Sequence, residues 1–278
     1  PPVKRVEIPK ANGRIRPLGI PTVADRIAQT VVRQVLEPQL EKHFHPDSYG
    51  YRPGKSAHQA LSMARKRCWQ YYWVLEFDIK GYFDNIDHDL LMNAVRKKKK
   101  KKWVRLYIER WLKAPVQMAN GELQPRDRGT PQGGVVSPLL ANLFLHYTFD
   151  RWMQRHHREI PFERYADDGV LHCRSKEQAE RLKQVLQERF RACGLELHPV
   201  KTRVIYCKNY RCKEDYPNVS FDFLGFTFRP RGARSKAGGL FTGFLPAISN
   251  KAAKAIRQEV REWALQKKSD KHLHDLAK

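Results

Sequence analysis

Residues 162–172 read FERYADDGVLH, and this stretch decides the fold class. Strand-forming residues lie on both sides of a short polar turn at Ala166-Asp167, which is the pattern of two strands joined in a hairpin. Strands joined by so short a turn are antiparallel. The stretch therefore predicts an antiparallel sheet, although the pattern alone does not exclude parallel βαβ pairing in the chain.

A second strand is predicted upstream, over residues 73–79, where apolar residues alternate so that Glu76 and Asp78 share one face. Further predicted elements are helices after Thr22, after the Pro53-Gly54 turn, after an N-cap at Ser137, after a Ser175–Gln178 capping box and after Ser249, strands near Thr202–Tyr206 and over Phe221–Phe228, and a loop over 229–239. Helices combined with an antiparallel sheet place the chain in the α+β class.

Three acidic residues mark the ends of these strands. Asp78 ends the first strand, and Asp167 and Asp168 lie in the hairpin turn. Two unit charges about 4 Å apart repel by about 4 kcal/mol at an effective dielectric constant near 20, so a cluster of three needs cations. Mg²⁺ suits such a cluster, because it takes oxygen ligands and keeps positions open for phosphate; two such ions can promote an in-line displacement at phosphorus. The alternative is that Asp-Asp forms an ordinary polar turn.

The charge of the chain points to a polyanionic partner. Its 278 residues include 53 Lys and Arg against 29 Asp and Glu, a formal net charge of +24, and 41% are hydrophobic, which excludes a disordered chain. This balance argues against a neutral metabolic enzyme and favours nucleic acid, with an anionic membrane surface second. No apolar run reaches the roughly 20 residues that span a bilayer. The five cysteines lack metal-binding spacing, as is typical of reduced thiols in a cytosolic protein.

Seven blocks of sequence carry a resemblance to a known family. In chain order they are IPKANGRIRPLGIPTVADR at 8–26, YRPGKSAHQAL at 51–61, FDIKGYFDNIDH at 77–88, GTPQGGVVSPLLANLFLH at 129–146, YADDG at 165–169, GLELHPVKT at 194–202 and FLGFTF at 223–228. Together they resemble the reverse transcriptases encoded by group II introns, also called maturases. The resemblance implies a right-hand polymerase with an antiparallel palm sheet packed on helices. It implies fingers over 1–72, a palm over 73–245 with a finger insertion around 93–135, and the start of a thumb over 246–278.

The resemblance also implies roles for individual residues. The implied catalytic and metal-binding groups are Asp78, Asp167, Asp168 and the main-chain carbonyl of Ile79, which would hold two Mg²⁺ ions. The implied nucleotide-binding residues are Lys10, Arg16, Phe83, Gln132 and Lys201, with Phe83 as an aromatic gate against the 2′ hydroxyl of rNTPs. The implied nucleic-acid contacts are Arg52 and Lys55 to the template backbone, and Leu224, Gly225 and Phe226 at the primer end. From the residues alone, the preferred interpretation of Phe83 is a core aromatic beside Tyr82. Lys10 and Arg16 are equally well interpreted as solvated loop cations, and the alternative for 224–226 is an ordinary strand.

The implied function is RNA-directed DNA polymerisation on an RNA template with a DNA primer and dNTPs, together with binding of intron RNA in splicing. The alternatives are a non-catalytic RNA-binding splicing cofactor and a reverse transcriptase of the retron or diversity-generating type. The family has a further block ahead of residue 1 and more thumb helices, so we expect this chain to bind RNA but polymerise poorly. We also expect weak homodimers through an exposed helix over Ser249–Leu265, no membrane partner, and a location in the bacterial cytoplasm. Whether the Lys97–Lys102 run is natural or engineered is open from sequence.

Overall fold

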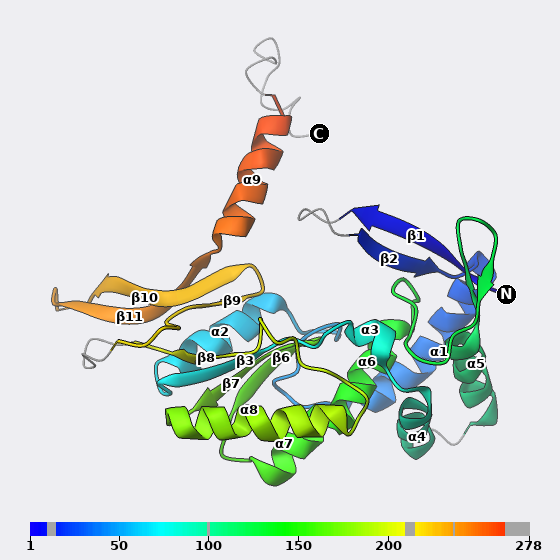
Figure 1. Cartoon of the computed structure of the whole chain (residues 1–278), viewed down its shortest axis with the longest axis horizontal. Helices are drawn as coiled ribbons and strands as arrows, with labels where there is room; N and C mark the ends of the chain where they lie inside the picture. The colour runs from blue at the N-terminus through cyan, green and yellow to red at the C-terminus, as the bar shows by residue number, and fades with distance from the viewer. Residues whose placement is uncertain (10–14, 99–100, 209–214, 236, 265–278) are drawn as a thin grey trace. The chain divides into compact units, whose positions relative to one another are not determined.

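The computed structural model describes residues 1–9, 15–98, 101–208, 215–235 and 237–264. The chain forms two compact units, residues 1–205 and residues 206–278, which are described separately (Figure 1). Within residues 1–205, the segments that the sequence analysis assigned to fingers and palm are joined by hydrogen bonds, for example between Asp47 and Arg164. The boundary at 205/206 divides the chain by its packing, and the division into fingers, palm and thumb stays a prediction.

A four-stranded sheet lies at the centre of the first unit, in the order β6-β7-β3-β8. The strands are β3 (Trp73–Phe77), β6 (Phe162–Tyr165), β7 (Asp168–Cys173) and β8 (Arg203–Tyr206). Both β6 and β3 pair antiparallel with β7, which confirms the antiparallel prediction. Because Phe77 is paired with Gly169, the next residue along β3 comes opposite Asp168. The register therefore brings the predicted acidic residues to one end of the sheet.

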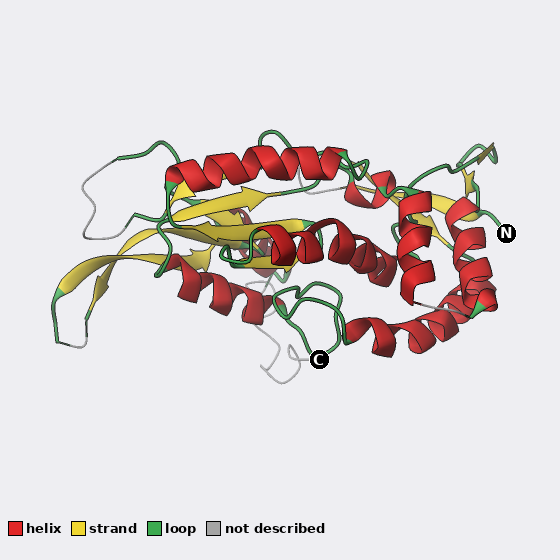
Figure 2. Ribbon diagram, turned by 90° about the horizontal axis from the view of Figure 1, so that it is seen from below, coloured by secondary structure: helices red, strands yellow, loops and turns green. Residues whose placement is uncertain are grey.

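Helices cover the sheet on both faces (Figure 2). On one face, Phe77 packs against Phe149 and against Phe190 of α8 (Lys176–Arg191), with ring centroids 5.1 and 5.7 Å apart. On the other face, α2 (Ala57–Cys68) packs on β6 and β7 and begins with a capping box between Ser56 and Gln59. The alternation predicted for residues 73–79 is thus confirmed. One set of side chains packs into the aromatic core, and the other set faces α2 and the acidic end of the sheet.

One long helical segment runs beneath the hairpin and contains a π-helical turn. It consists of α6 (Ser137–Leu145), η1 (His146–Asp150) and α7 (Arg151–His156). Ser137 was predicted as an N-cap, and this is wrong: the helix begins at Ser137, whose Oγ instead accepts a hydrogen bond from the Thr130 hydroxyl at 2.8 Å. The π-helical turn lies where Asp150 enters the core, which fits the frequent use of such turns at functional positions.

A second sheet of the same unit has the order β2-β1-β4-β5. Its strands are β1 (Val3–Pro9), β2 (Ile15–Ile20), β4 (Val116–Gln117) and β5 (Leu123–Gln124), and the surrounding helices are α1 (Val23–Glu41), α3 (Tyr82–Asn85), α4 (His88–Lys98) and α5 (Lys102–Lys113). The predicted cap at Thr22 is confirmed, since its side chain accepts a hydrogen bond from the backbone N–H of Asp25, and Asp87 caps α4 in the same way by accepting from the Leu90 N–H. Helix α5 was not predicted, although Val104, Ile108 and Trp111 lie at helical spacing.

The second unit corrects two predictions. It contains β9 (Phe221–Phe223), β10 (Phe226–Arg234), β11 (Leu240–Ile248) and α9 (Asn250–Glu262). The single strand predicted over Phe221–Phe228 is wrong, because Leu224 and Gly225 have φ of +51° and +82° and form a tight turn between antiparallel strands. The loop predicted over 229–239 is also wrong, because β10 continues through most of it and pairs with β11 along its length. The predicted cap of α9 at Ser249 is confirmed.

Among the described helices, none is both long enough and apolar enough to cross a membrane.

A buried ion pair on the α2 side of the sheet predicts a pH-dependent stability. His172 Nε2 lies 2.6 Å from Glu163 Oε2, and neither side chain is exposed. Burial alone would lower the pKa of His172, but the Glu163 carboxylate and the Cys68 side chain together more than offset it and raise the pKa to about 9. Because the folded pKa lies above the unfolded value of 6.5, the stabilisation is complete below about pH 6.5 and is lost as the pH rises through about 9.

We expect the free energy of unfolding to fall by on the order of 1–3 kcal/mol across this range. Urea unfolding curves at pH 6 to 9.5 measure it. The variant His172→Gln, which keeps a side-chain donor but does not titrate, should lose most of this pH dependence. An identical dependence in the variant and the parent would contradict the assignment.

Candidate active site

Three aspartates meet at the end of the central sheet. Asp78 follows β3 directly. The turn between β6 and β7 consists of Ala166, at φ +55°, and Asp167, and Asp168 is the first residue of β7. Burial and the neighbouring Asp167 and Asp78 carboxylates raise the pKa of Asp168 to about 7. Burial and the Asp78 charge also raise the pKa of Asp167. These shifts share two physical causes: burial, which is the larger, and negative charges held together without enough positive charge beside them.

One cation of the protein lies within this acidic group. Lys201 Nζ donates to Asp78 Oδ2 at 2.6 Å, and this carboxylate outweighs partial burial and raises the pKa of Lys201. The place near the nucleotide phosphates that the resemblance implies for Lys201 stays a prediction, and in this structure its ammonium group pairs with Asp78, a predicted metal ligand. One ammonium group against three carboxylates leaves an excess of negative charge.

The donor set fits a hard divalent cation. Carboxylate oxygens and a main-chain carbonyl are the ligands that Mg²⁺ prefers. Two backbone hydrogen bonds pair Ile79 with Leu197: the Asp78 carbonyl accepts from the His198 N–H, and the Lys80 N–H donates to the Glu196 carbonyl. The Ile79 carbonyl takes part in neither of them. Within the described residues, however, no three His, Cys, Asp or Glu side chains converge closely enough to hold an ion as they stand. The three aspartates therefore lie at one end of the sheet without forming a closed set of ligands.

Two predicted nucleotide-binding residues are joined directly beside this end of the sheet. Arg16 Nε, on β2, donates to Gln132 Oε1 at 3.1 Å, and Gln132 Nε2 donates to both Asp84 carboxylate oxygens at 3.2 and 3.3 Å. The positive charge of Arg16 is close enough to the Asp167 carboxylate to stabilise its ionised form. Arg16 is exposed, so its guanidinium is accessible to a phosphate. Lys10 lies outside the described residues.

Phe83 and Tyr82, adjacent in sequence, have different environments. Tyr82 is 2% exposed and its hydroxyl donates to the Ala141 carbonyl at 2.5 Å, so Tyr82 is the core aromatic. Phe83 is only half-buried, and its ring lies edge-on to Tyr51 with centroids 6.4 Å apart. Burial and the charge of Asp167 raise the pKa of Tyr51, which puts this ring pair next to the aspartates. This placement favours the gate hypothesis for Phe83 over the core alternative.

The predicted nucleic-acid contacts have different surroundings. Arg52 is 6% exposed at its side chain; it pairs with Glu41 at 2.6 Å and donates to the carbonyls of His45 and Ser48. With its donors taken by protein groups, Arg52 is a structural residue here, and we drop its predicted template contact. Lys55 is half-buried, with its ammonium group over the Tyr49 ring, and its template contact stays a prediction. Residues 224–226 form the β9–β10 turn of the second unit, and their primer contact stays a prediction as well.

Three residues at this site were missed by the sequence analysis: Tyr51, Asp84 and Arg164. Tyr51 and Asp84 lie inside the sequence blocks that resemble reverse transcriptases. Their spacing does not show that Tyr51 lies near Asp167 or that Asp84 accepts hydrogen bonds from Gln132. Arg164 immediately precedes Tyr165 in the hairpin and looks from sequence like a solvated strand residue. A fully buried arginine is rare unless it is paired, so only its partners, which are distant in sequence, reveal it.

Comparison with known proteins agrees with this geometry. Residues 8–228 match the model of the family described as reverse transcriptase (RNA-dependent DNA polymerase). Protein YkfC of Escherichia coli is 40% identical over 157 residues, covering 55% of this chain and 41% of its own. The group II intron-encoded protein LtrA of Lactococcus lactis is 37% identical over 208 residues, covering 73% of this chain and 34% of its own. The chain thus spans well under half the length of these relatives.

Solved structures of similar fold include the telomerase of Candida albicans in complex with a fragment of telomeric RNA. It superposes with a TM-score of 0.64 at 14% sequence identity, over 82% of this chain and 44% of that one. Apo telomerase of Candida tropicalis, truncated of its C-terminal domain, gives a TM-score of 0.63 at 15% identity, over 82% of this chain and 53% of that one. At this identity the likeness shows the fold alone, a right-hand polymerase core of the α+β class. From the family match, the chain belongs to the reverse transcriptase (RNA-dependent DNA polymerase) family, and its relatives include proteins encoded by group II introns.

Proposed function

We propose that this chain carries the polymerising core of a group II intron reverse transcriptase, which adds dNTPs to a primer 3′ hydroxyl on an RNA template. In this reaction the 3′ oxygen bonds to the α-phosphorus of the dNTP, the bond to the bridging oxygen breaks, and pyrophosphate leaves while the hydroxyl proton passes to solvent. The observation that carries the proposal is the register of β3 and β7, which brings Asp78 opposite Asp168 beside the Arg16–Gln132 pair.

Each residue has a distinct task in this proposal. Asp78, Asp167 and the Ile79 carbonyl would hold two Mg²⁺ ions, with Asp168 in a weaker ligand role; when bound, such ions activate the attacking hydroxyl and stabilise the charge on the leaving group. Arg16 supplies a planar fork of donors for the triphosphate oxygens, and its hydrogen bond to Gln132 orients that fork before the nucleotide arrives.

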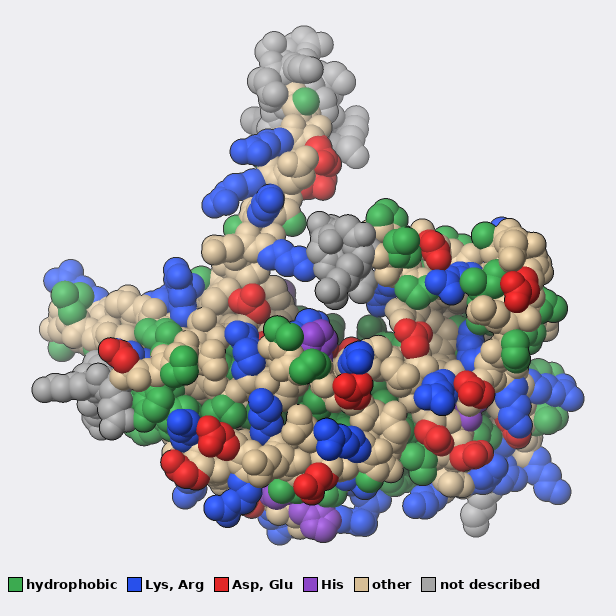
Figure 3. Space-filling view, viewed as in Figure 1, with side chains coloured by type: hydrophobic (Ala, Val, Ile, Leu, Met, Phe, Trp, Pro, Cys, Tyr) green, Lys and Arg blue, Asp and Glu red, His purple; other side chains and the backbone are tan. Residues whose placement is uncertain are grey.

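The proposed partners are RNA template, DNA primer, dNTP and intron RNA. Support comes from the net charge of +24 and from the basic surface of the first unit, where Lys and Arg side chains gather around α4, α5 and α7 (Figure 3). A cavity of about 510 Å³ at α7 is lined by Arg151, Arg155 and Arg158 and suits a phosphate backbone. We further propose a cytoplasmic location and weak self-association through α9, whose Ile256, Val260 and Trp263 are 44–53% exposed.

The test of the proposal is incorporation of a single nucleotide. The chain is bound in excess to an RNA template annealed to a DNA primer, and one templated dNTP is added with Mg²⁺. Extension by one nucleotide does not require the enzyme to stay bound through many cycles, so it separates chemistry from processivity. We expect incorporation of the templated dNTP and little of the other three. RNA binding without any incorporation would favour the non-catalytic splicing cofactor and contradict the polymerase assignment.

Phe83 provides a second prediction at the same site. Phe83→Ala should raise rNTP incorporation relative to dNTP about 10- to 100-fold, because a clash of one small group in a fitted pocket is worth about 1–3 kcal/mol. The measurement is the ratio of incorporation rates for the templated rNTP and dNTP. Tyr72→Ala, which removes an exposed aromatic before β3, is the matched control and should leave the ratio unchanged. An unchanged ratio in a folded Phe83→Ala protein would return Phe83 to a packing role.

A further inference from the structure

Arg164 lies fully buried directly beneath the aspartate turn. It belongs to β6, and its partner in the register is Gly169 on β7, so its side chain points to the aromatic face of the sheet. There its Nε and Nη2 donate to the two oxygens of Asp150, each at 2.8 Å, and neither side chain has any exposed surface. This is the two-pronged pairing in which a guanidinium is held in one orientation.

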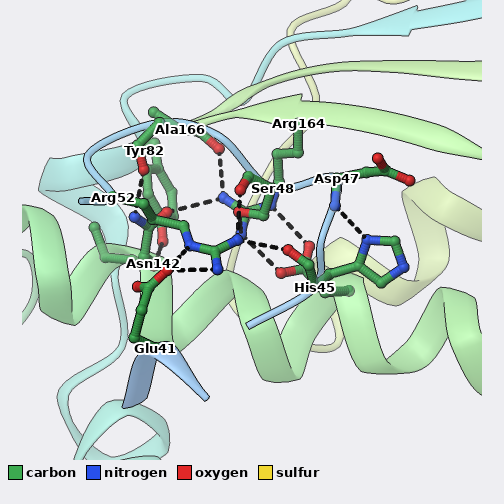
Figure 4. Close-up of polar contacts among 12 residues, drawn as sticks. Glu41, His45, Asp47, Ser48, Arg52, Tyr82, Asn142, Arg164 and Ala166 are labelled. Carbon is green, nitrogen blue, oxygen red and sulfur yellow. Dashed lines mark hydrogen bonds and ion pairs between the residues drawn. The ribbon is translucent and has the colours of Figure 1, made fainter. Parts of the chain in front are cut away.

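The remaining donors of Arg164 fix the turn. Nη1 donates to the Ala166 carbonyl at 2.9 Å and to Asn142 Oδ1 at 3.1 Å, and Nη2 donates to Ser48 Oγ at 2.7 Å (Figure 4). The Ala166 carbonyl belongs to the peptide unit that enters Asp167. Ala166 has φ +55°, a conformation that non-glycine residues rarely adopt and that persists only where the surroundings hold it. Arg164 is the group that holds it.

A segment far away in sequence completes this arrangement. Residues 47–50 lie along β6: Arg164 N–H donates to the Asp47 carbonyl at 3.0 Å, and Tyr49 N–H donates to the Arg164 carbonyl at 2.8 Å. Asn142 Nδ2 donates to the Gly50 carbonyl at 2.7 Å. The segment therefore packs against the turn from its outer side while Arg164 holds it from below.

A buried ion pair of this kind contributes little net stability to a fold. Apolar side chains of similar volume often replace such a pair without loss of stability, because removing two charges from water is costly. What apolar side chains cannot supply is a directed donor for the Ala166 carbonyl. We propose that Arg164 is a positioning residue that sets the carboxylates of the Ala166–Asp168 turn opposite Asp78. This inference rests on the proposed polymerase function for its purpose, but its geometry can be tested without activity.

The decisive variant removes the pair without leaving a buried charge. In Arg164→Met/Asp150→Leu the fold loses both charges and the donor to Ala166 together. Arg164→Lys keeps the charge but replaces the fork with a single point donor. The matched control is Arg67→Lys, because Arg67 also pairs with two carboxylates, Asp47 at 2.7 Å and Glu163 at 2.6 Å, yet does not touch the turn. Each protein is measured for thermal stability, RNA affinity, amide hydrogen exchange over 162–173, and Mn²⁺ binding by electron paramagnetic resonance.

For the double variant we expect a melting temperature and an RNA affinity close to those of the parent. Its amide exchange in the Ala166–Asp168 turn should be about tenfold faster and its Mn²⁺ affinity about tenfold weaker, the change that loss of one directed hydrogen bond brings. Arg164→Lys should show the same two changes, and it decides the matter if the double variant does not fold. Arg67→Lys should show neither.

Unchanged exchange and Mn²⁺ affinity in the folded Arg164 variants would overturn the inference, as would equal changes in Arg67→Lys. Failure of the polymerase proposal has a different sign, because the unsubstituted protein would then incorporate no dNTP in the single-nucleotide assay. The exchange and Mn²⁺ measurements still decide the role of Arg164 in that case, because neither depends on turnover.

Discussion

Replacing Asp78 or Asp167 with alanine should reduce single-nucleotide incorporation by about 10³-fold or more, while RNA affinity changes less than twofold. Ligands of a catalytic metal contribute several kcal/mol to the transition state, and about 4 kcal/mol corresponds to a thousandfold in rate. RNA affinity is instead distributed over many Lys and Arg residues of a chain with a net charge of +24. Rapid-quench measurement of one dNTP addition and a filter-binding titration with the same RNA give the two values.

Asp127→Ala is the control for this prediction. Asp127 also lies in the first unit, but its side chain is 86% exposed and pairs only loosely with Arg128 at 3.6 Å. Its removal should leave both measurements unchanged. Retention of more than a tenth of the parent rate in Asp78→Ala and Asp167→Ala would show that the carboxylates at the end of β3 and β7 are not the catalytic groups.

Gly50→Ala should strongly destabilise the protein. A Cβ on Gly50 would lie 2.4 Å from the Ala166 nitrogen and 3.1 Å from the Tyr165 carbonyl carbon, and both contacts are to backbone. Since neither chain segment can move without breaking the hydrogen bonds around Arg164, we expect a loss of about 3 kcal/mol in unfolding free energy. We also expect at least a hundredfold loss of dNTP incorporation, because the turn that carries Asp167 must shift.

The control for Gly50 is Gly232→Ala. Gly232 lies in β10, where an added Cβ meets nothing within 4 Å and φ is not positive. Its replacement should change the unfolding free energy by less than about 1 kcal/mol. Chemical denaturation of both variants measures the difference. A Gly50→Ala protein as stable and as active as Gly232→Ala would show that the 47–50 segment can separate from the turn at little cost.

Local signals predicted the elements around the site well. The polar turn at Ala166-Asp167, the alternation over 73–79 and the caps at Thr22, Ser175 and Ser249 all depend on neighbours a few residues apart, and the structure confirms them. The wrong strand prediction over Phe221–Phe228 has a matching cause. Leu224 adopts a positive φ that a leucine side chain disfavours, so its residue type does not indicate a turn. Gly225 is the single residue of this turn whose type indicates one.

The sequence by itself determined the α+β class, the antiparallel hairpin, the family resemblance and the three aspartates, because these depend on residue type, periodicity and order. Only the tertiary structure decided which charged residues act inside the protein. In sequence, Arg16, Arg52 and Arg164 all look like exposed cations. In the structure Arg16 is exposed, whereas the side chains of Arg52 and Arg164 are buried and each has a fixed set of hydrogen-bond acceptors. Those acceptors come from segments up to 116 residues away. Partners so distant are brought together by packing of the whole unit, and no local pattern specifies them.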